Sequence, residues 1–275
     1  MCFYNDERQP NIGIVACSAR GGAPDVLNYS ITKLSNYSMT QHIGIVACSA
    51  EGAALCYRTI CVEGAAAMGR HAHPEVSMHT HPLADYMRCI YADDWQGVAD
   101  LMLSSAEKLA RMGADFLISP DNTIHRAFHL VAPRSSRPWL HIVEEVAAEA
   151  KRQNYRRLAL LGTRYTMEGP VYPVKLETAG IDHAVPTAEE RERIDQIIFD
   201  ELVYGKFTPQ SLSYFLQVIG RLRALGCDAV VLGCTEIPLL VTPETSPLPT
   251  LDSTRILARA AVKKAVDSGQ SSVAS

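Results

Sequence analysis

The stretch DAVVLGCTEIPLL, residues 228–240, decides the fold class of this 275-residue chain. Its first part, AVVLG, is apolar at consecutive positions, which is typical of a parallel strand buried on both faces. Polar residues Cys234, Thr235 and Glu236 follow where this strand would end. Open parallel sheets bind ligands at the carboxyl ends of their strands. The stretch therefore predicts an α/β protein with functional groups just beyond a buried strand.

A second stretch repeats this arrangement earlier in the chain. Residues 108–123, KLARMGADFLISPDNT, and residues 221–236, RLRALGCDAVVLGCTE, share one order of features. In each, a helical pattern ends at a glycine, a strand follows, and polar residues come next. We therefore expect two equivalent α/β halves, each presenting a polar tetrad (Asp121–Ile124 and Cys234–Ile237) at a strand end.

The rest of the chain alternates between short apolar runs and longer helical patterns, which is typical of βαβ units. The predicted strands are 43–48, 75–81, 114–120, 138–143, 156–162, 180–186, 227–233 and 247–252. The predicted helices are 51–67, 93–112, 122–132, 143–153, 166–179, 187–204, 209–226 and 254–267.

An internal repeat stands at the front of the chain. Residues 11–19, NIGIVACSA, and residues 42–50, HIGIVACSA, are identical at eight of nine positions. No third copy follows, so the repeat does not indicate a solenoid. Only the second copy runs on into a helical pattern. We therefore expect residues 1–38 to be an extension outside the core fold, whether a misassigned start, a duplication or an accessory segment.

Composition excludes several classes of protein. Twenty-six basic and thirty acidic residues give a net charge of −4, which argues against a nucleic-acid partner. No apolar run is long enough to span a bilayer, and no signal peptide is recognisable, so we expect a cytoplasmic protein without membrane contact. The eight cysteines are too sparse for a disulfide scaffold. No glycine-rich dinucleotide motif is present, and we expect no cofactor.

Asp121 and Cys234 are the candidate catalytic residues. If the two halves face each other, these side chains flank one cleft from opposite sides, as removal and return of a proton at one carbon require. The N–H groups of the following helix would lower the pKa of the Cys234 thiol. The alternatives are a buried structural thiol for Cys234 and a helix N-cap for Asp121.

Residues 42–267 resemble the aspartate/glutamate racemase superfamily. The matching stretches are HIGIVACSAEGAALCYR, ADFLISPDNTIH, LLGTRYTMEG, IIFDELVYGKFTP, DAVVLGCTEIPLL and PTLDST. The resemblance implies two flavodoxin-like three-layer αβα halves related by a pseudo-twofold axis, with the active site in the cleft between them. It also implies a homodimeric, cofactor-independent isomerase that racemises an acidic amino acid. We expect residues 39–137 with 253–270 to form one half, residues 138–252 the other, and residues 271–275 a disordered tail.

The chain departs from this family at one decisive position. The family has a cysteine in each half; the second matches Cys234, but Asp121 stands in place of the first. Aspartate is less basic than a thiolate by about four to five pKa units, or roughly 6 kcal/mol. Three explanations are open. Asp121 is a weak but well-oriented base, the substrate has a more acidic proton than an amino acid does, or Cys234 alone carries out the chemistry. The last two cases fit an isomerase, decarboxylase or lyase acting on a dicarboxylate, and an inactive carboxylate-binding homologue is a further alternative.

Other polar residues are predicted to bind a small carboxylate substrate. The expected ligands of its carboxylate are hydroxyl and amide groups that stabilise negative charge, and Glu236 would bind its ammonium or orient Thr235. The binding set is Asn122, Thr123, Thr163, Thr166, Thr235, Glu236, His79 and Lys206, with Lys206 for a distal carboxylate. The cluster His71, His73, His79 and His81 has a metal site as its alternative interpretation, because His79 and His81 lie on one face of a predicted strand and could chelate an ion. No third ligand follows at a zinc-like spacing, so we expect no metal.

Overall fold

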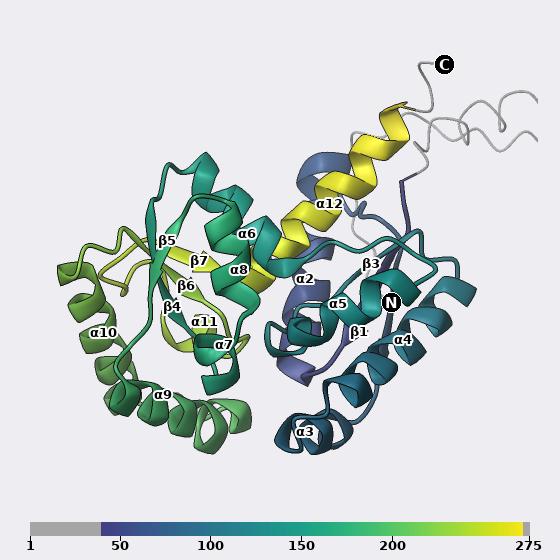
Figure 1. Ribbon diagram of the computed structural model, residues 1–275. Coiled ribbons are helices and arrows are strands. Elements are labelled where there is room, and N and C mark those ends of the chain that lie inside the picture. Colours follow the sequence, from purple (N-terminus) through teal and green to yellow (C-terminus); the bar gives the residue numbers. More distant parts are fainter. Residues whose placement is uncertain (1–39, 272–275) are drawn as a thin grey trace, which may run out of the picture. The chain divides into compact units, whose positions relative to one another are not determined.

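The computed structural model describes residues 40–271, and the side chains of residues 40–267 (Figure 1). The predicted extension at residues 1–38 and residues 272–275 of the predicted tail lie outside the described residues. In the described part of the chain, no helix is long and apolar enough to cross a membrane.

Two parallel sheets organise the fold. The first sheet has the order β2-β1-β3 and the second has the order β5-β4-β6-β7, with every strand pair parallel. The strands are β1 (Ile43–Ala47), β2 (Val76–Thr80), β3 (Phe116–Ile118), β4 (Arg157–Leu161), β5 (Asp182–Ala184), β6 (Ala229–Leu232) and β7 (Thr250–Asp252). The predicted α/β class with parallel strands is therefore confirmed.

Helices connect the strands and cover the sheets. The α-helices are α2 (Ala50–Met68), α3 (Leu83–Tyr91), α4 (Trp95–Arg111), α5 (Phe128–Val131), α6 (Ile142–Arg152), α7 (Arg164–Glu168), α8 (Val171–Thr178), α9 (Ala188–Asp200), α10 (Pro209–Ala224), α11 (Ile237–Leu240) and α12 (Ser253–Ser271). The 3-10 turns are η1 (Thr123–Ala127), η2 (Ala132–Arg134) and η3 (Leu202–Tyr204).

Each sheet buries side chains on both faces, as consecutive apolar residues in parallel strands require. In β1, Ile45 packs in a core with α2, α6 and α12, whereas Val46 packs with α3 and α4. In β4, Leu160 belongs to the same core as Ile45, whereas Leu161 packs with α9 and α10. The arrangement is three-layered in both halves.

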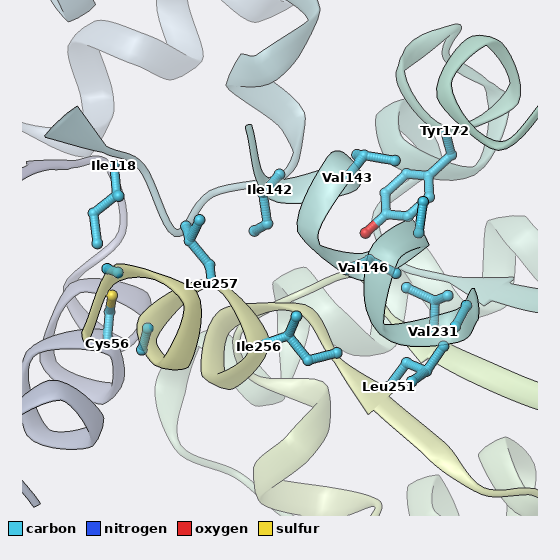
Figure 2. Close-up of a cluster of buried hydrophobic side chains, with 14 of the residues drawn as sticks. Cys56, Ile118, Ile142, Val143, Val146, Tyr172, Val231, Leu251, Ile256 and Leu257 are labelled. Carbon is cyan, nitrogen blue, oxygen red and sulfur yellow. The ribbon is translucent and has the colours of Figure 1, made fainter. Parts of the chain in front are cut away.

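One hydrophobic core joins the two sheets through α6 and α12 (Figure 2). Ile118 of β3 and Val231 of β6 both belong to it, although they lie in different sheets. Between them lie Val146 of α6 and Ile256 and Leu257 of α12. Fully burying an aliphatic side chain contributes roughly 1.5–3 kcal/mol, so this cluster holds the two halves against each other.

The predicted strand at 138–143 is wrong. Its backbone pairs with the sheet at a single bridge between Leu117 and Trp139, which is too short to form a strand. The chain turns into α6 at Ile142 because the His141 ring accepts a hydrogen bond of 3.2 Å from the Val143 N–H and caps the helix. An apolar run was therefore read as a strand where the first turn of a helix begins.

Two further differences concern helices. Helix α3 was not predicted; it begins after Pro82 and buries Tyr86 and Ile90, which lie one turn apart. The single helix predicted at 166–179 is divided into α7 and α8 at Gly169 and Pro170. A Cβ at Gly169 would lie 2.3 Å from the Tyr165 carbonyl oxygen, so the chain can turn there only with glycine.

Candidate active site

A cavity of about 60 Å³ lies where strand ends of both sheets meet. Cys48 follows β1 and Asp121 follows β3 in the first sheet, while Thr163 follows β4 and Cys234 follows β6 in the second. All four line this cavity. The carboxyl ends of parallel strands are thus opposed around one space, the position at which α/β proteins bind small ligands.

Gly233 sets the position of Cys234. Its N–H donates a hydrogen bond of 2.7 Å to the carbonyl of Leu161, the last residue of β4. A Cβ at Gly233 would lie 2.9 Å from that same oxygen, so no larger residue fits without a shift. The close approach of β4 and β6 brings Cys234 directly to the cavity.

Cys234 is buried, with 8% of its surface exposed, and its thiol donates a hydrogen bond of 2.9 Å to Oε2 of Glu236. Burial raises the pKa of this thiol well above its ordinary value, and the negative charge of Glu236 raises it further. The expectation of a lowered pKa is therefore wrong. The following helix, α11, spans only Ile237–Leu240, and its N-terminus does not outweigh burial and an adjacent carboxylate.

Thr235 connects this loop to the first half. Its Oγ1 donates a hydrogen bond of 2.7 Å to Oε2 of Glu236 and lies 3.3 Å from Oγ of Ser49, the N-cap of α2. Gly52 packs against it so closely that a Cβ there would lie 2.5 Å from Cγ2 of Thr235. The polar residues after β6 are thus held by the start of α2.

Asp121 both caps a turn and faces the cavity. Its Oδ1 accepts a hydrogen bond of 3.1 Å from the Ile124 N–H, and its backbone oxygen lies 2.7 Å from Nδ1 of His125. Burial raises the pKa of the Asp121 carboxyl, and the charge of Glu236 raises it too, against the opposing effect of the Ile124 N–H. The capping and cavity-lining positions coincide in one side chain.

Cys48 lines the cavity, although it was not in the predicted site set: its place at the end of the first predicted strand suggested a pocket-lining residue, but a small apolar residue explained it equally well. It is buried, and it lines the cavity together with Asp121. Burial and then the charge of Asp121 raise its pKa well above the ordinary value. The available signal was its place at the end of the first predicted strand, 43–48, where a side chain would meet the cleft.

Three threonines form a cluster across the two halves. Oγ1 of Thr123 lies 3.1 Å from Oγ1 of Thr163 and 3.4 Å from Oγ1 of Thr166, which themselves lie 3.3 Å apart. Thr123 and Thr163 line the cavity, and Thr163 also caps α7. Thr166 lies behind them, outside the lining residues.

Asn122 is held by the protein on both sides of its amide. Its Nδ2 donates a hydrogen bond of 2.9 Å to Oγ of Ser253, and its Oδ1 accepts one of 2.8 Å from the Tyr172 hydroxyl. Ser253 is the first residue of α12 and Tyr172 lies in α8. Asn122 is therefore fixed in orientation where it lines the cavity.

Two predicted binding residues lie away from the cavity. His79 contacts Oγ of Ser105 at 2.9 Å and Nζ of Lys108 at 2.9 Å, and it does not line the cavity. Lys206 follows η3, is exposed, and is not a lining residue either. Within residues 40–267, no group of three His, Cys, Asp or Glu side chains is placed to hold a metal ion.

The cavity wall away from the strand ends is apolar. Its residues are Leu83, Met87 and Ile90 of α3, Ile198 and Phe199 of α9, Tyr165 and Val203. Among the residues whose side chains are described, the charged ones that line the cavity are Asp121 and Glu236. The α3 side of this wall was missed because that helix was not predicted.

Comparisons with known proteins match most of the chain. The family model described as Asp/Glu/Hydantoin racemase matches residues 45–261. The broad specificity amino-acid racemase RacX of Bacillus subtilis is 25% identical over 175 residues, covering 62% of this chain and 75% of RacX.

Solved structures agree with this match. A Yersinia pestis protein provisionally described as an Asp/Glu racemase has a TM-score of 0.77 and 31% identity, covering 82% of this chain and 99% of that one. An aspartate racemase homologue from Pyrococcus horikoshii has a TM-score of 0.71 and 27% identity, with the same coverage. The predicted resemblance and the two-domain fold are confirmed. The chain belongs to the Asp/Glu/hydantoin racemase family.

Proposed function

We propose that this chain is a cofactor-independent amino-acid racemase in which Asp121 and Cys234 serve opposite faces of the substrate α-carbon. One observation carries the proposal: both side chains line the same small cavity, and each follows a strand of a different sheet. Membership in a racemase family supports an isomerase. A carbon held between the two groups can lose a proton to one and gain a proton from the other.

In each turnover the substrate loses one proton and gains one, and proton exchange with water then restores the starting form of the enzyme. The Asp121 carboxylate takes the α-proton, and the electron pair left on the carbon delocalises into the substrate carboxylate. The Cys234 thiol then gives its proton to the opposite face and becomes a thiolate. The reverse reaction starts from the form with Asp121 protonated and Cys234 ionised, so each form of the enzyme accepts one enantiomer.

The raised pKa values suit these roles. A buried thiol beside Glu236 stays protonated at rest and serves as the acid. A raised pKa makes Asp121 a stronger base than an exposed aspartate, and this reduces the difference in basicity between Asp121 and a thiolate.

Charge developing on the substrate carboxylate needs hydrogen-bond donors that are already in place. Asn122, Thr123 and Thr163 line the cavity and offer amide and hydroxyl groups for this purpose, whereas the hydroxyl of Thr235 already donates to Glu236. Glu236 provides a negative charge for the substrate ammonium while it orients Thr235.

The relatives' names suggest more than one substrate. Aspartate and glutamate racemases point to acidic amino acids, whereas RacX is described as having broad specificity. From the family resemblance we also propose a homodimer in the cytoplasm, with halves formed by residues 39–137 with 253–270 and by residues 138–252. Light scattering after size-exclusion chromatography tests the dimer.

Proton exchange tests the proposed function. Wild-type protein is incubated in D₂O with each enantiomer of a panel of amino acids, and deuterium at the α-carbon is followed by NMR together with chiral analysis. Exchange with inversion is expected, and Cys234→Ser should abolish it. Cys61→Ser is the matched control, since Cys61 lies in α2 and does not line the cavity. Full activity of Cys234→Ser would refute the assigned role.

A decarboxylase that uses Cys234 alone is the second candidate. The observation that favours it is the protonated, Glu236-bonded thiol, which can deliver a proton to a carbanion left by loss of carbon dioxide. Release of carbon dioxide from a substituted malonate, without exchange into any amino acid, would select this reaction.

A further inference from the structure

The side of the cavity formed by α3 is an apolar surface. Leu83, Met87 and Ile90 are spaced four and three residues apart, so they lie on one face of the helix. All three line the cavity, and Leu83 and Met87 remain partly exposed there. Partly exposed apolar side chains in a pocket favour a ligand group that removes them from water.

The facing side is apolar as well. Ile198 and Phe199 of α9 and Val203 of η3 line the same cavity (α3 and α9 are labelled in Figure 1). Tyr165 of α7 adds an aromatic ring. A group that enters between α3 and α9 therefore meets hydrocarbon from both halves of the protein.

The charges at the cavity have one sign. Asp121 and Glu236 are both acidic, and within residues 40–267 no lysine, arginine or histidine lines the cavity. A second carboxylate on the substrate would meet two like charges without a lining cation. Like charges in a partly buried site repel strongly because water screens them poorly.

Arg164 and Lys206 follow cavity-lining residues in the sequence but do not themselves line the cavity. The Arg164 guanidinium lies 5.7 Å from the centroid of the Tyr165 ring and is exposed. Lys206 lies beyond Val203 and is exposed to water. Either would have to give up hydration to reach a carboxylate among the apolar residues.

We propose that the substrate carries an uncharged, apolar substituent on its α-carbon, and that this substituent lies between α3 and α9. The inference rests on the proposed function, which places the α-carbon between Asp121 and Cys234. Straight-chain aliphatic and methionine-like side chains match a wall made of Leu, Met, Ile and Val.

The first test compares norleucine with glutamate, whose side chains are both unbranched and similar in length. In D₂O exchange with the wild-type protein, norleucine should exchange at least about tenfold faster, since each buried methylene favours binding and the second carboxylate opposes it. Faster exchange of glutamate or aspartate would overturn the inference while leaving the racemase proposal standing. Loss of that acidic exchange in Lys206→Ala or Arg164→Ala would identify the cation responsible.

The second test changes the wall. Met87→Arg adds a cation to the cavity and should shift the ratio of exchange rates toward glutamate by about tenfold or more. Met87→Leu, which keeps the wall apolar, should leave norleucine ahead. Leu83→Arg repeats the test one helical turn away if Met87→Arg fails to fold, as judged by its thermal melt. An unchanged ratio in a folded arginine variant would contradict the placement of the substituent.

Ligand binding separates the two proposals. Saturation-transfer NMR on the wild-type protein measures norleucine and glutamate binding without requiring turnover. Binding of norleucine without exchange of any amino acid would refute the racemase proposal and support the apolar wall. Preferential binding of glutamate would refute the apolar wall.

Discussion

The thiol of Cys234 donates a hydrogen bond of 2.9 Å to the carboxylate of Glu236, two residues further along the chain. A short loop after β6 therefore contains both an acid and the anion that keeps it protonated. On the other side of the cavity, burial and then the charge of the Asp121 carboxylate raise the pKa of the Cys48 thiol. The cavity is thus lined by two thiol–carboxylate pairs.

Replacing Glu236 should release the Cys234 thiol. In Glu236→Gln the negative charge is lost, so the pKa of Cys234 should fall toward its ordinary range. At a fixed pH near 8, iodoacetamide should then alkylate Cys234 faster, which mass spectrometry of the Cys234 peptide measures against the wild type. Slower alkylation in the variant would show that the carboxylate is not what holds the thiol protonated.

Asp121 can be tested with two variants of opposite effect. Asp121→Asn removes the base and should lower exchange by about 100-fold or more. Asp121→Cys restores the residue of the family pattern and should retain more exchange than Asp121→Asn. The measurement is deuterium incorporation at the α-carbon for both enantiomers. Equal exchange in Asp121→Asn and the wild type would remove Asp121 from the proposed pair.

Gly52 should matter for the reaction although it does not line the cavity. A Cβ there would lie 2.5 Å from Thr235, so Gly52→Ala must displace the Thr235 side chain or the start of α2. Alanine favours the helix by about 1 kcal/mol relative to glycine, so the fold should persist while exchange falls. A thermal melt and the exchange assay together check this. Gly220→Ala in α10 is the control, because a Cβ there meets nothing within 4 Å.

Acid should destabilise the fold through buried histidines. Burial lowers the pKa of His141 to about 2 and that of His125 to about 4, so both stay neutral in the folded state while the unfolded chain protonates them below about pH 6.5. Their contribution to stability is present above that pH and is lost as pH falls. At pH 5, His141 alone should cost about 2 kcal/mol.

Urea denaturation at pH 7 and pH 5 measures this loss. His141→Asn keeps a side chain that can cap α6 and should lose less stability on acidification than the wild type. The exposed His129 provides the control, since His129→Asn should show the wild-type dependence. If His141→Asn and the wild type lose equal unfolding free energy between pH 7 and pH 5, His141 is not the source of the acid destabilisation.

The sequence predicted the parts of the fold that depend on local pattern. Strands β1, β4 and β6 consist largely of consecutive apolar residues, which is the pattern typical of buried parallel strands. Helix α3 was missed because it is short and begins directly after a strand and Pro82. With α3 missing, the apolar wall of the cavity could not be anticipated.

The chemistry of the site was harder to predict than its place. The start of a helix after Cys234 is visible in the sequence, but the burial of its thiol beside the Glu236 carboxylate is not. Burial first, and then the charge of Glu236, reverse the expected direction of the pKa shift. The interaction between Cys48 and Asp121 joins residues from two different strand ends, so it depends on the order of strands in the sheet. Pairs of residues that are this far apart in the sequence cannot be predicted without the strand order.

Helix α12 leaves β7 of the second sheet and packs against α2, which follows β1 of the first. The C-terminal helix therefore carries the chain from the second sheet back to the first half, and it packs there in one core with α6 of the second half. The side chains of α3 and α9 meet instead at the cavity, which both halves line. A substrate bound there would contact both halves, so its binding should also favour their association.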